Sequence, residues 1–238
     1  MEHYNNIKNK IKEKGYIKIT FEPADSNSER LSFDDISTTL DTNLVRLRGW
    51  SYPMIPPYDR AEGEIFKRPY NVGSGKAYYS DFEDRKEVGV LFKSGQFISM
   101  VSIIEDYMPE YRGKDMTKIK YFDFLSLIYK ITEIILFIKK YTESRGINGG
   151  NLKIELGNMN KRLLDSIFSF NIFPFSAKYE SMIETIAVDR KISREEILSD
   201  DLKVSRSIII EIFQSFNWDN PSESMIETHQ NNLMTGRI

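Results

Sequence analysis

Apolar and polar residues alternate with a period of two in several short segments, most of them in the first half of the chain. Such alternation is typical of strands that bury one face. Together with short apolar runs, it predicts strands at residues 16–21, 44–48, 64–68, 76–80, 88–92, 97–104, 152–156 and 179–188. The strands at 88–92 and 97–104 are separated by four residues that include Gly95, which can supply the positive φ of a tight turn. We therefore expect a β-hairpin there.

Apolar residues spaced three and four apart predict helices, mainly in the second half of the chain. The predicted helices cover residues 3–14, 32–40, 117–141, 160–168, 201–216 and 222–233. Ser32 is placed to cap the second of these, and Ser193 with Glu196 fits a capping box. The helix at 117–141 is apolar on nearly all its faces, which indicates a central helix enclosed by its neighbours.

The order of these elements favours an α+β fold, because strands dominate the first half and helices the second. We predict a mainly antiparallel sheet packed against the long buried helix, with further helices at the C-terminal end. No internal repeat, low-complexity tract or linker divides the sequence. The chain is therefore expected to form a single domain over residues 1–238, with the helix and strand of residues 1–40 at its periphery.

Composition excludes several classes of protein. The 238 residues include no cysteine, which excludes disulfides, thiolate zinc sites and cysteine nucleophiles. The formal net charge of −2 gives no whole-protein field that would attract nucleic acid or acidic membranes. The longest apolar run contains Asp123, Lys130 and Glu133, and such charges disfavour a membrane-spanning helix. We expect a soluble, cytoplasmic protein that does not contact membranes.

The catalytic patterns in the sequence are incomplete. The glycine-rich segment 71–76 lacks the first glycine of a phosphate-binding loop and has no Ser or Thr after its lysine. His3 and His229 lie near the chain ends without metal-ligand spacing. Residues 84–86, Asp-Arg-Lys, have the carboxylate–lysine spacing of a restriction-type nuclease core, but they stand in a polar turn. The sequence therefore predicts no catalytic residue, no metal and no cofactor, with nuclease activity as an alternative.

A basic and aromatic stretch is the strongest candidate for a binding site. After the predicted strand at 44–48, the chain passes Trp50 and enters a segment with three prolines, which must run as an extended, ordered loop. Cationic side chains bind phosphates or carboxylates, and Trp and Tyr faces stack on bases or peptide side chains. The candidate binding residues are Arg46, Arg48, Trp50, Tyr52, Tyr58, Arg60, Lys67, Arg68 and Lys76. A sheet edge capped by aromatic residues would explain the same pattern without a ligand.

Two short motifs resemble a group of poorly characterised bacterial proteins. Residues 47–53, Leu-Arg-Gly-Trp-Ser-Tyr-Pro, resemble an Arg-Gly-Trp-aromatic-Pro motif, and residues 93–97, Lys-Ser-Gly-Gln-Phe, resemble the hairpin that follows it there. Such proteins sometimes occur beside Schlafen-type AlbA-like domains or in phage-defence neighbourhoods. The resemblance implies a bacterial accessory or sensor module and implies no catalytic residues, because the glutamate and lysine pattern of an AlbA-like domain is not evident.

Three functions follow as hypotheses. The first is a non-catalytic bacterial module that binds a partner protein or a small ligand through the basic and aromatic stretch. The second is an accessory protein that binds or cleaves nucleic acid, for which a steep salt dependence of binding is expected. The third is an oligomeric scaffold assembled through the terminal helix around Met225, Ile226 and Leu233.

Overall fold

A computed structural model of the protein describes residues 2–26, 29–55, 58–61, 64–67, 69–111, 114–168 and 177–237. Its centre is a seven-stranded sheet in the order β14-β11-β1-β7-β6-β5-β4, in which every pair of neighbours is antiparallel. These strands are β1 (Tyr16–Pro23), β4 (Tyr70–Val72), β5 (Gly75–Asp81), β6 (Lys86–Phe92), β7 (Phe97–Ser102), β11 (Gly149–Gly157) and β14 (Thr185–Ser193). The sheet confirms the predicted α+β class.

Short strands form smaller pairings around the main sheet. They are β2 (Tyr58–Ala61) with β3 (Glu64–Lys67), β8 (Glu110–Tyr111) with β9 (Lys114–Asp115), and β10 (Tyr121–Asp123), β12 (Leu163–Asp165) and β13 (Tyr179–Glu180) in a three-stranded group. The helices are α1 (Glu2–Lys12), α2 (Phe33–Thr42), α3 (Phe124–Ser144), α4 (Arg194–Ser199), α5 (Asp201–Gln214) and α6 (Glu223–Thr235), with a 3₁₀ helix at Ile104–Tyr107.

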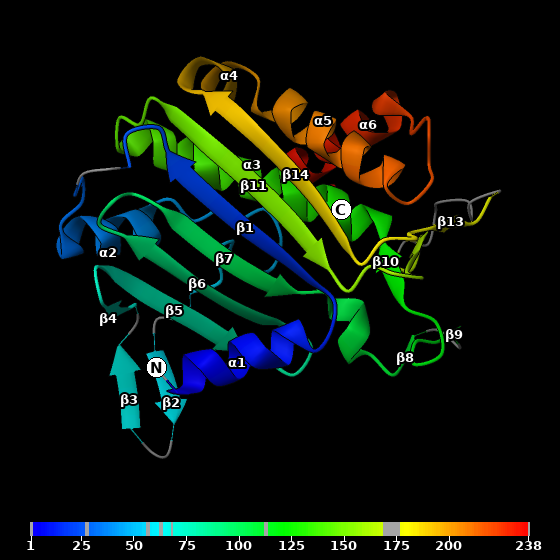
Figure 1. Ribbon diagram of the computed structural model, residues 1–238, viewed down its shortest axis with the longest axis horizontal. Coiled ribbons are helices and arrows are strands. Elements are labelled where there is room, and N and C mark those ends of the chain that lie inside the picture. Colours follow the sequence, from blue (N-terminus) through cyan, green and yellow to red (C-terminus); the bar gives the residue numbers. More distant parts are fainter. Residues whose placement is uncertain are drawn as a thin grey trace.

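Two apolar cores lie on opposite faces of the sheet. The larger core packs the inward residues of β1, β7, β11 and β14 against α3, with α5 and α6 beside α3 at the β14 edge of the sheet (Figure 1). The smaller core lies under α1, whose Tyr4, Ile7 and Ile11 cover Val88, Val90 and Met100 of β6 and β7. The spacing of three and four along α1 puts its apolar residues on one face, and burial of that face holds the helix on the sheet.

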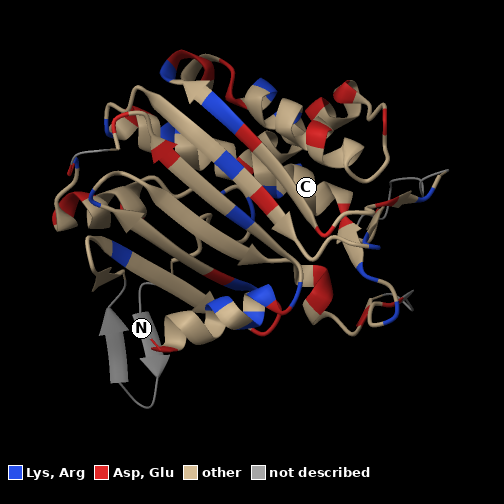
Figure 2. Cartoon of the chain, in the orientation of Figure 1, with Lys and Arg blue, Asp and Glu red and all other residues tan. Residues whose placement is uncertain are grey.

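The open face of the sheet carries charges of both signs. Lys and Arg alternate with Asp and Glu along the outward positions of β1, β11 and β14 (Figure 2). Lys18 of β1 lies opposite Glu155 of β11 and pairs with it at 2.7 Å, and Lys153 reaches the same carboxylate at 3.3 Å. Because the charges alternate, these three strands present no continuous basic surface.

The hairpin predicted from the sequence is present as β6 and β7. Gly95 in its turn has φ +86°, a backbone conformation that favours glycine. The hydroxyl of Tyr141, in the last turns of α3, donates a hydrogen bond of 2.7 Å to the Gly95 carbonyl. This hydrogen bond attaches the turn of the hairpin to the central helix.

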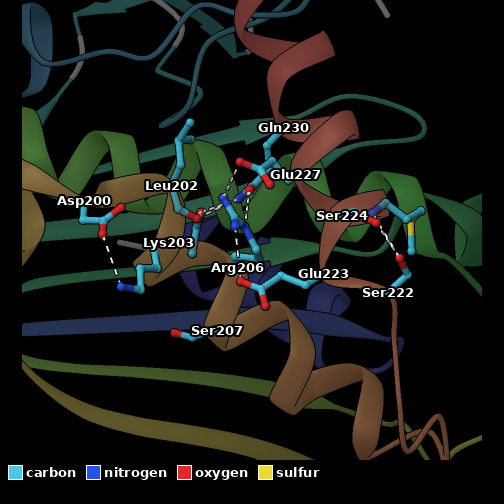
Figure 3. Close-up of polar contacts among 12 residues, drawn as sticks. Asp200, Leu202, Lys203, Arg206, Ser207, Ser222, Glu223, Ser224, Glu227 and Gln230 are labelled. Atoms are coloured by element: carbon cyan, nitrogen blue, oxygen red, sulfur yellow. Dashed lines mark hydrogen bonds and ion pairs between the residues drawn. The ribbon is translucent and has the colours of Figure 1, made fainter.

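A buried polar group joins the C-terminal helix to the rest of the protein (Figure 3). The amide of Gln230 in α6 donates to Ser205 Oγ of α5 at 2.6 Å and to Thr132 Oγ1 of α3 at 3.3 Å. Arg206 of α5 forms ion pairs with Glu223 at 3.2 Å and Glu227 at 3.4 Å on α6. Three helices therefore meet at one fully buried amide.

The capping predictions are confirmed. Ser32 accepts from the backbone of Asp35 at the start of α2, and Ser193 accepts from Glu196 at the start of α4, each within a capping box. Ser222 caps α6 through the amide of Met225. These residues were predictable because capping depends on a few adjacent positions.

Four predicted elements differ from the structure, and the strand expected at the periphery, β1, instead lies between β11 and β7 inside the sheet. The strand at 44–48 is wrong: this segment forms only an isolated bridge between Val45 and Tyr52. The helix at 160–168 is wrong, since residues 163–165 form β12. The central helix begins at Phe124 rather than at 117, because Asp123 caps it after the short strand β10. The last predicted strand is divided into β13 and β14.

Candidate ligand-binding pocket

A cavity of about 410 Å³ lies between one end of the sheet and the first turns of α3. Its floor is apolar and includes Ile17, Val101, Ile103, Phe122, Leu125 and Phe168. Polar and charged side chains line its other parts, among them Arg48, Trp50, Arg85, Glu105, Tyr129 and Lys130. A mostly apolar cavity of a few hundred Å³ with a few convergent polar groups is typical of a small-molecule site.

One charged wall of the pocket is held by an ion pair. Arg48 Nε donates to Glu133 Oε1 at 2.8 Å, and the terminal nitrogen NH2 donates to Oε2 at 2.6 Å. The side chains are 10% and 0% exposed, respectively. A bidentate pair of this kind is fixed in orientation as well as in distance. It ties the segment after α2 to the middle of α3 and gives the Arg48 side chain a structural role.

Trp50 lies in contact with two guanidinium groups. The guanidinium carbon of Arg85 is 3.4 Å from the centroid of the Trp50 ring, and that of Arg48 is 4.8 Å away. Tyr129 adds a second aromatic face 5.5 Å from Arg48. Stacking on aromatic rings leaves the in-plane N–H groups of a guanidinium available for other partners.

Arg85 forms no ion pair in the described part of the chain, although the carboxylates of Asp84, Glu133 and Glu87 act on its charge at longer range. Its guanidinium forms neither a hydrogen bond nor an ion pair with any described residue. Burial lowers the pKa of this group, but a guanidinium stays protonated in proteins. Arg85 is therefore a charged donor that lines an apolar cavity and is free to bind an anion.

Lys130 lies one turn before Glu133 on α3 and lines the same pocket. Its Nζ is 3.6 Å from Glu133 Oε2 and 5.0 Å from the centroid of the Tyr52 ring. Burial lowers the pKa of Lys130, and Arg48 and Arg85 act in the same direction, whereas the carboxylates of Glu133 and Glu87 oppose the shift.

Two buried carboxyl groups, those of Glu105 and Asp123, also line the pocket. Burial, reinforced by the neighbouring Asp123, raises the pKa of Glu105 to about 8. Glu105 Oε1 accepts from the backbone amide of Asp123 at 2.7 Å. Asp123 in turn accepts from the amides of Ser126 and Ile167 at 2.7 Å and 2.8 Å. These bonds fix the start of α3 and the wall of the pocket beside it.

The structure separates the residues that the sequence grouped into one binding face. Arg48 and Trp50 line the pocket, whereas Tyr52 is fully buried with its ring 5.8 Å from that of Phe137. Arg46 is exposed in a different depression, beside Lys140. The prediction failed for these residues because the segment is not a strand, so alternate positions do not share a face.

The remaining candidates do not join the pocket either, or lie beyond what the structure describes. Lys76 donates from Nζ to Ser37 Oγ of α2 and lies 6.0 Å from the ring of Phe33. Arg68 lies outside the described residues, and the side chains of three others are not described: Tyr58, Arg60 and Lys67.

Sequence reasoning missed Arg85, Tyr129 and Lys130. In the sequence, Arg85 stands out only as the middle residue of a possible nuclease motif, in which Lys86 is the expected functional cation. Lys86 instead binds Asp81 Oδ1 at 2.5 Å and the carbonyl of Phe82 at 2.8 Å. Lys130 was visible as a charge inside the longest apolar run, and a charge in such a run must find a partner or a cavity.

The described residues contain no group of three His, Cys, Asp or Glu side chains that could bind a metal ion. Within the same residues, no helix has the length and apolar character needed to cross a membrane. Comparisons of the chain with protein-family models, curated proteins and solved structures give no match.

Proposed function

We propose that this protein is a binding module for a small amphipathic anion, which it holds in the pocket between the sheet and α3. The observation that carries the proposal is the guanidinium of Arg85, stacked on Trp50 at 3.4 Å and without a described partner. A carboxylate, sulfonate or phosphate would pair with Arg85, and the apolar part of the ligand would occupy the floor around Val101 and Phe122.

The charge distribution supports an anion rather than a cation near Trp50. Arg48, Arg85 and Lys130 line this part of the pocket, and Glu133 is engaged in both hydrogen bonds with Arg48. Hydrogen bonds to charged groups are stronger than neutral ones. Beside buried side chains they also act across a lower dielectric than in bulk water. An anionic group would thus gain more here than on the open, mixed-charge face of the sheet.

Titration with 8-anilinonaphthalene-1-sulfonate, followed by fluorescence and calorimetry, tests this function. This probe combines a sulfonate with an apolar aromatic body. The wild-type protein is expected to bind one equivalent, and Arg85→Gln is expected to weaken binding by about tenfold or more, because a charge-assisted hydrogen bond contributes roughly 1.5–3 kcal/mol.

Arg46→Gln is the matched control, because Arg46 comes from the same basic stretch but lies outside the pocket. It should bind the probe as the wild type does. Equal affinity of Arg85→Gln and wild type would contradict the proposed function.

A further inference from the structure

Three cations and one engaged carboxylate meet beside the pocket. Arg48, Arg85 and Lys130 are close enough to influence one another, and Glu133 lies between Arg48 and Lys130. Arg48 occupies both oxygens of Glu133 at 2.8 and 2.6 Å, whereas Lys130 Nζ is 3.6 Å from the nearer one. Lys130 is therefore the less well satisfied partner of a shared carboxylate.

A second buried carboxyl group, that of Glu87, also acts on Lys130 and opposes the lowering of its pKa. Glu87 is 1% exposed and accepts from the hydroxyl groups of Tyr78 at 3.0 Å and Ser99 at 3.4 Å. Burial raises the pKa of Glu87, so its neutral form is favoured relative to an exposed glutamate. The more Glu87 is protonated, the more the cluster carries an excess of positive charge.

Loss of a proton from Lys130 relieves that excess. Arginine side chains do not deprotonate in proteins, whereas a lysine ammonium does so readily when it is buried among other cations. Lys130 is 13% exposed and its amine forms no hydrogen bond with any of the residues that the structure describes. A neutral amine that lines a ligand-sized cavity is the arrangement of a nucleophilic lysine.

We propose that Lys130 condenses with an aldehyde or ketone whose anionic group is held by Arg85. The neutral amine nitrogen forms a bond to the carbonyl carbon and gives up its two protons, and the carbonyl oxygen takes up these two protons and leaves as water. The product is an imine between Nζ and the former carbonyl carbon. No oxidant or reductant is needed. This inference rests on the proposed pocket and narrows its ligands to anionic carbonyl compounds.

Trapping with borohydride tests the inference. Pyridoxal 5′-phosphate serves as an anionic aldehyde probe, and the imine is reduced to a stable amine that intact-mass measurement counts and peptide mapping locates. We expect one saturable adduct on the wild-type chain, at Lys130, formed at least about tenfold faster than at the exposed Lys140 of the same helix. Mapping on the wild type needs no variant that could fail to fold.

Variants define the origin of the adduct. Lys130→Arg keeps a long basic side chain but has no nucleophilic amine and should lose the adduct, whereas Lys140→Arg should keep it. Arg85→Gln should slow pyridoxal 5′-phosphate to the rate of pyridoxal, which lacks the phosphate. Labelling spread over surface lysines, unchanged in Lys130→Arg, would overturn the inference.

The two proposals fail separately. If 8-anilinonaphthalene-1-sulfonate binds through Arg85 while Lys130 stays unlabelled, only the covalent step is wrong. If neither probe responds to Arg85→Gln, the pocket itself is not an anion site.

Discussion

Arg48 and Glu133 form a bidentate ion pair between residues 85 positions apart in the sequence, with donor–acceptor distances of 2.8 and 2.6 Å. The pair joins the irregular segment after α2 to the middle of the central helix. It also sets the electrostatic conditions of the pocket, because it engages the carboxylate nearest to Lys130.

Removal of Glu133 is expected to destabilise the fold strongly. Glu133→Gln leaves the buried Arg48 without the carboxylate that it pairs with, and breaking a buried pair in this way costs about 3–5 kcal/mol. Urea unfolding followed by circular dichroism measures the change. The double variant Arg48→Met/Glu133→Gln should lose less than the sum of the single variants, because it removes the orphaned guanidinium.

Glu155→Gln is the control for that experiment. Glu155 pairs with Lys18 and Lys153 on the open sheet face, where both lysines are at least 35% exposed. Its loss should cost no more than about 1 kcal/mol. If Glu133→Gln and Glu155→Gln lowered the free energy of unfolding equally, burial would not make the Arg48–Glu133 pair more stabilising than an exposed pair.

Stability should fall as the pH rises from about 4.5 to about 8, because Glu105 keeps its proton in the folded state. A glutamate in the unfolded chain has a pKa of about 4.5, and in the folded state burial raises the pKa of Glu105 to about 8. Between these values the folded state binds more protons than the unfolded state, so raising the pH favours unfolding. Each such group contributes about 1.4 kcal/mol per pH unit in this window.

The comparison of wild type with Glu105→Gln isolates this contribution. Glutamine resembles the protonated carboxyl group and does not titrate, so the variant should show a flatter dependence of unfolding free energy on pH between 4.5 and 8. Parallel curves for the two proteins would contradict the assignment. Burial also raises the pKa values of Asp123 and Glu87. Both residues are present in the wild type and in the variant, so the two proteins differ only at position 105.

Gln230 is expected to be the main polar anchor of α6. Gln230→Ala leaves the hydroxyl groups of Ser205 and Thr132 without their amide donor and opens space between three helices, which should cost about 1–3 kcal/mol. Gln214→Ala is a matched control, because Gln214 is exposed and makes one bond of 3.3 Å to the Asp219 carbonyl. Thermal unfolding should separate the two variants, and a similar melting temperature would argue against the role of Gln230.

Trp50 is expected to position Arg85. Trp50→Leu removes the ring on which the guanidinium stacks and should weaken probe binding by about fivefold, since cation–π contacts in partly desolvated sites contribute roughly 1 kcal/mol. Calorimetry with 8-anilinonaphthalene-1-sulfonate gives the value. An unchanged dissociation constant would mean that Arg85 reaches the anion without the stack.

Local sequence signals predicted the fold well where they depend on few residues. The turn at Gly95, the capping boxes at Ser32 and Ser193 and the amphipathic face of α1 all follow from adjacent positions. The strand expected at 44–48 failed because its alternation reflects separate tertiary contacts: Val45 packs in the core, Arg48 meets Glu133, and Arg46 is exposed.

The pocket was only half predictable for a related reason. Arg48 and Trp50 stood out as large side chains beside a proline-rich loop. Their partners come from distant elements, since Arg85 precedes β6 and Lys130 lies on α3. Which cation finds a carboxylate and which stays free is decided by packing. No local pattern contains that information.

The central claim is that an anion binds beside Trp50, and the indole N–H resonance of this residue reports on it directly. The chain contains two tryptophans. The second, Trp218, stacks on Tyr179 and Phe213 at 4.8 and 5.1 Å and does not line the pocket. In a ¹H–¹⁵N spectrum of wild-type protein titrated with 8-anilinonaphthalene-1-sulfonate, with Trp218→Phe to assign the signals, the Trp50 resonance should shift in a saturable manner while that of Trp218 stays in place. A stationary Trp50 resonance at saturating probe would contradict the claim.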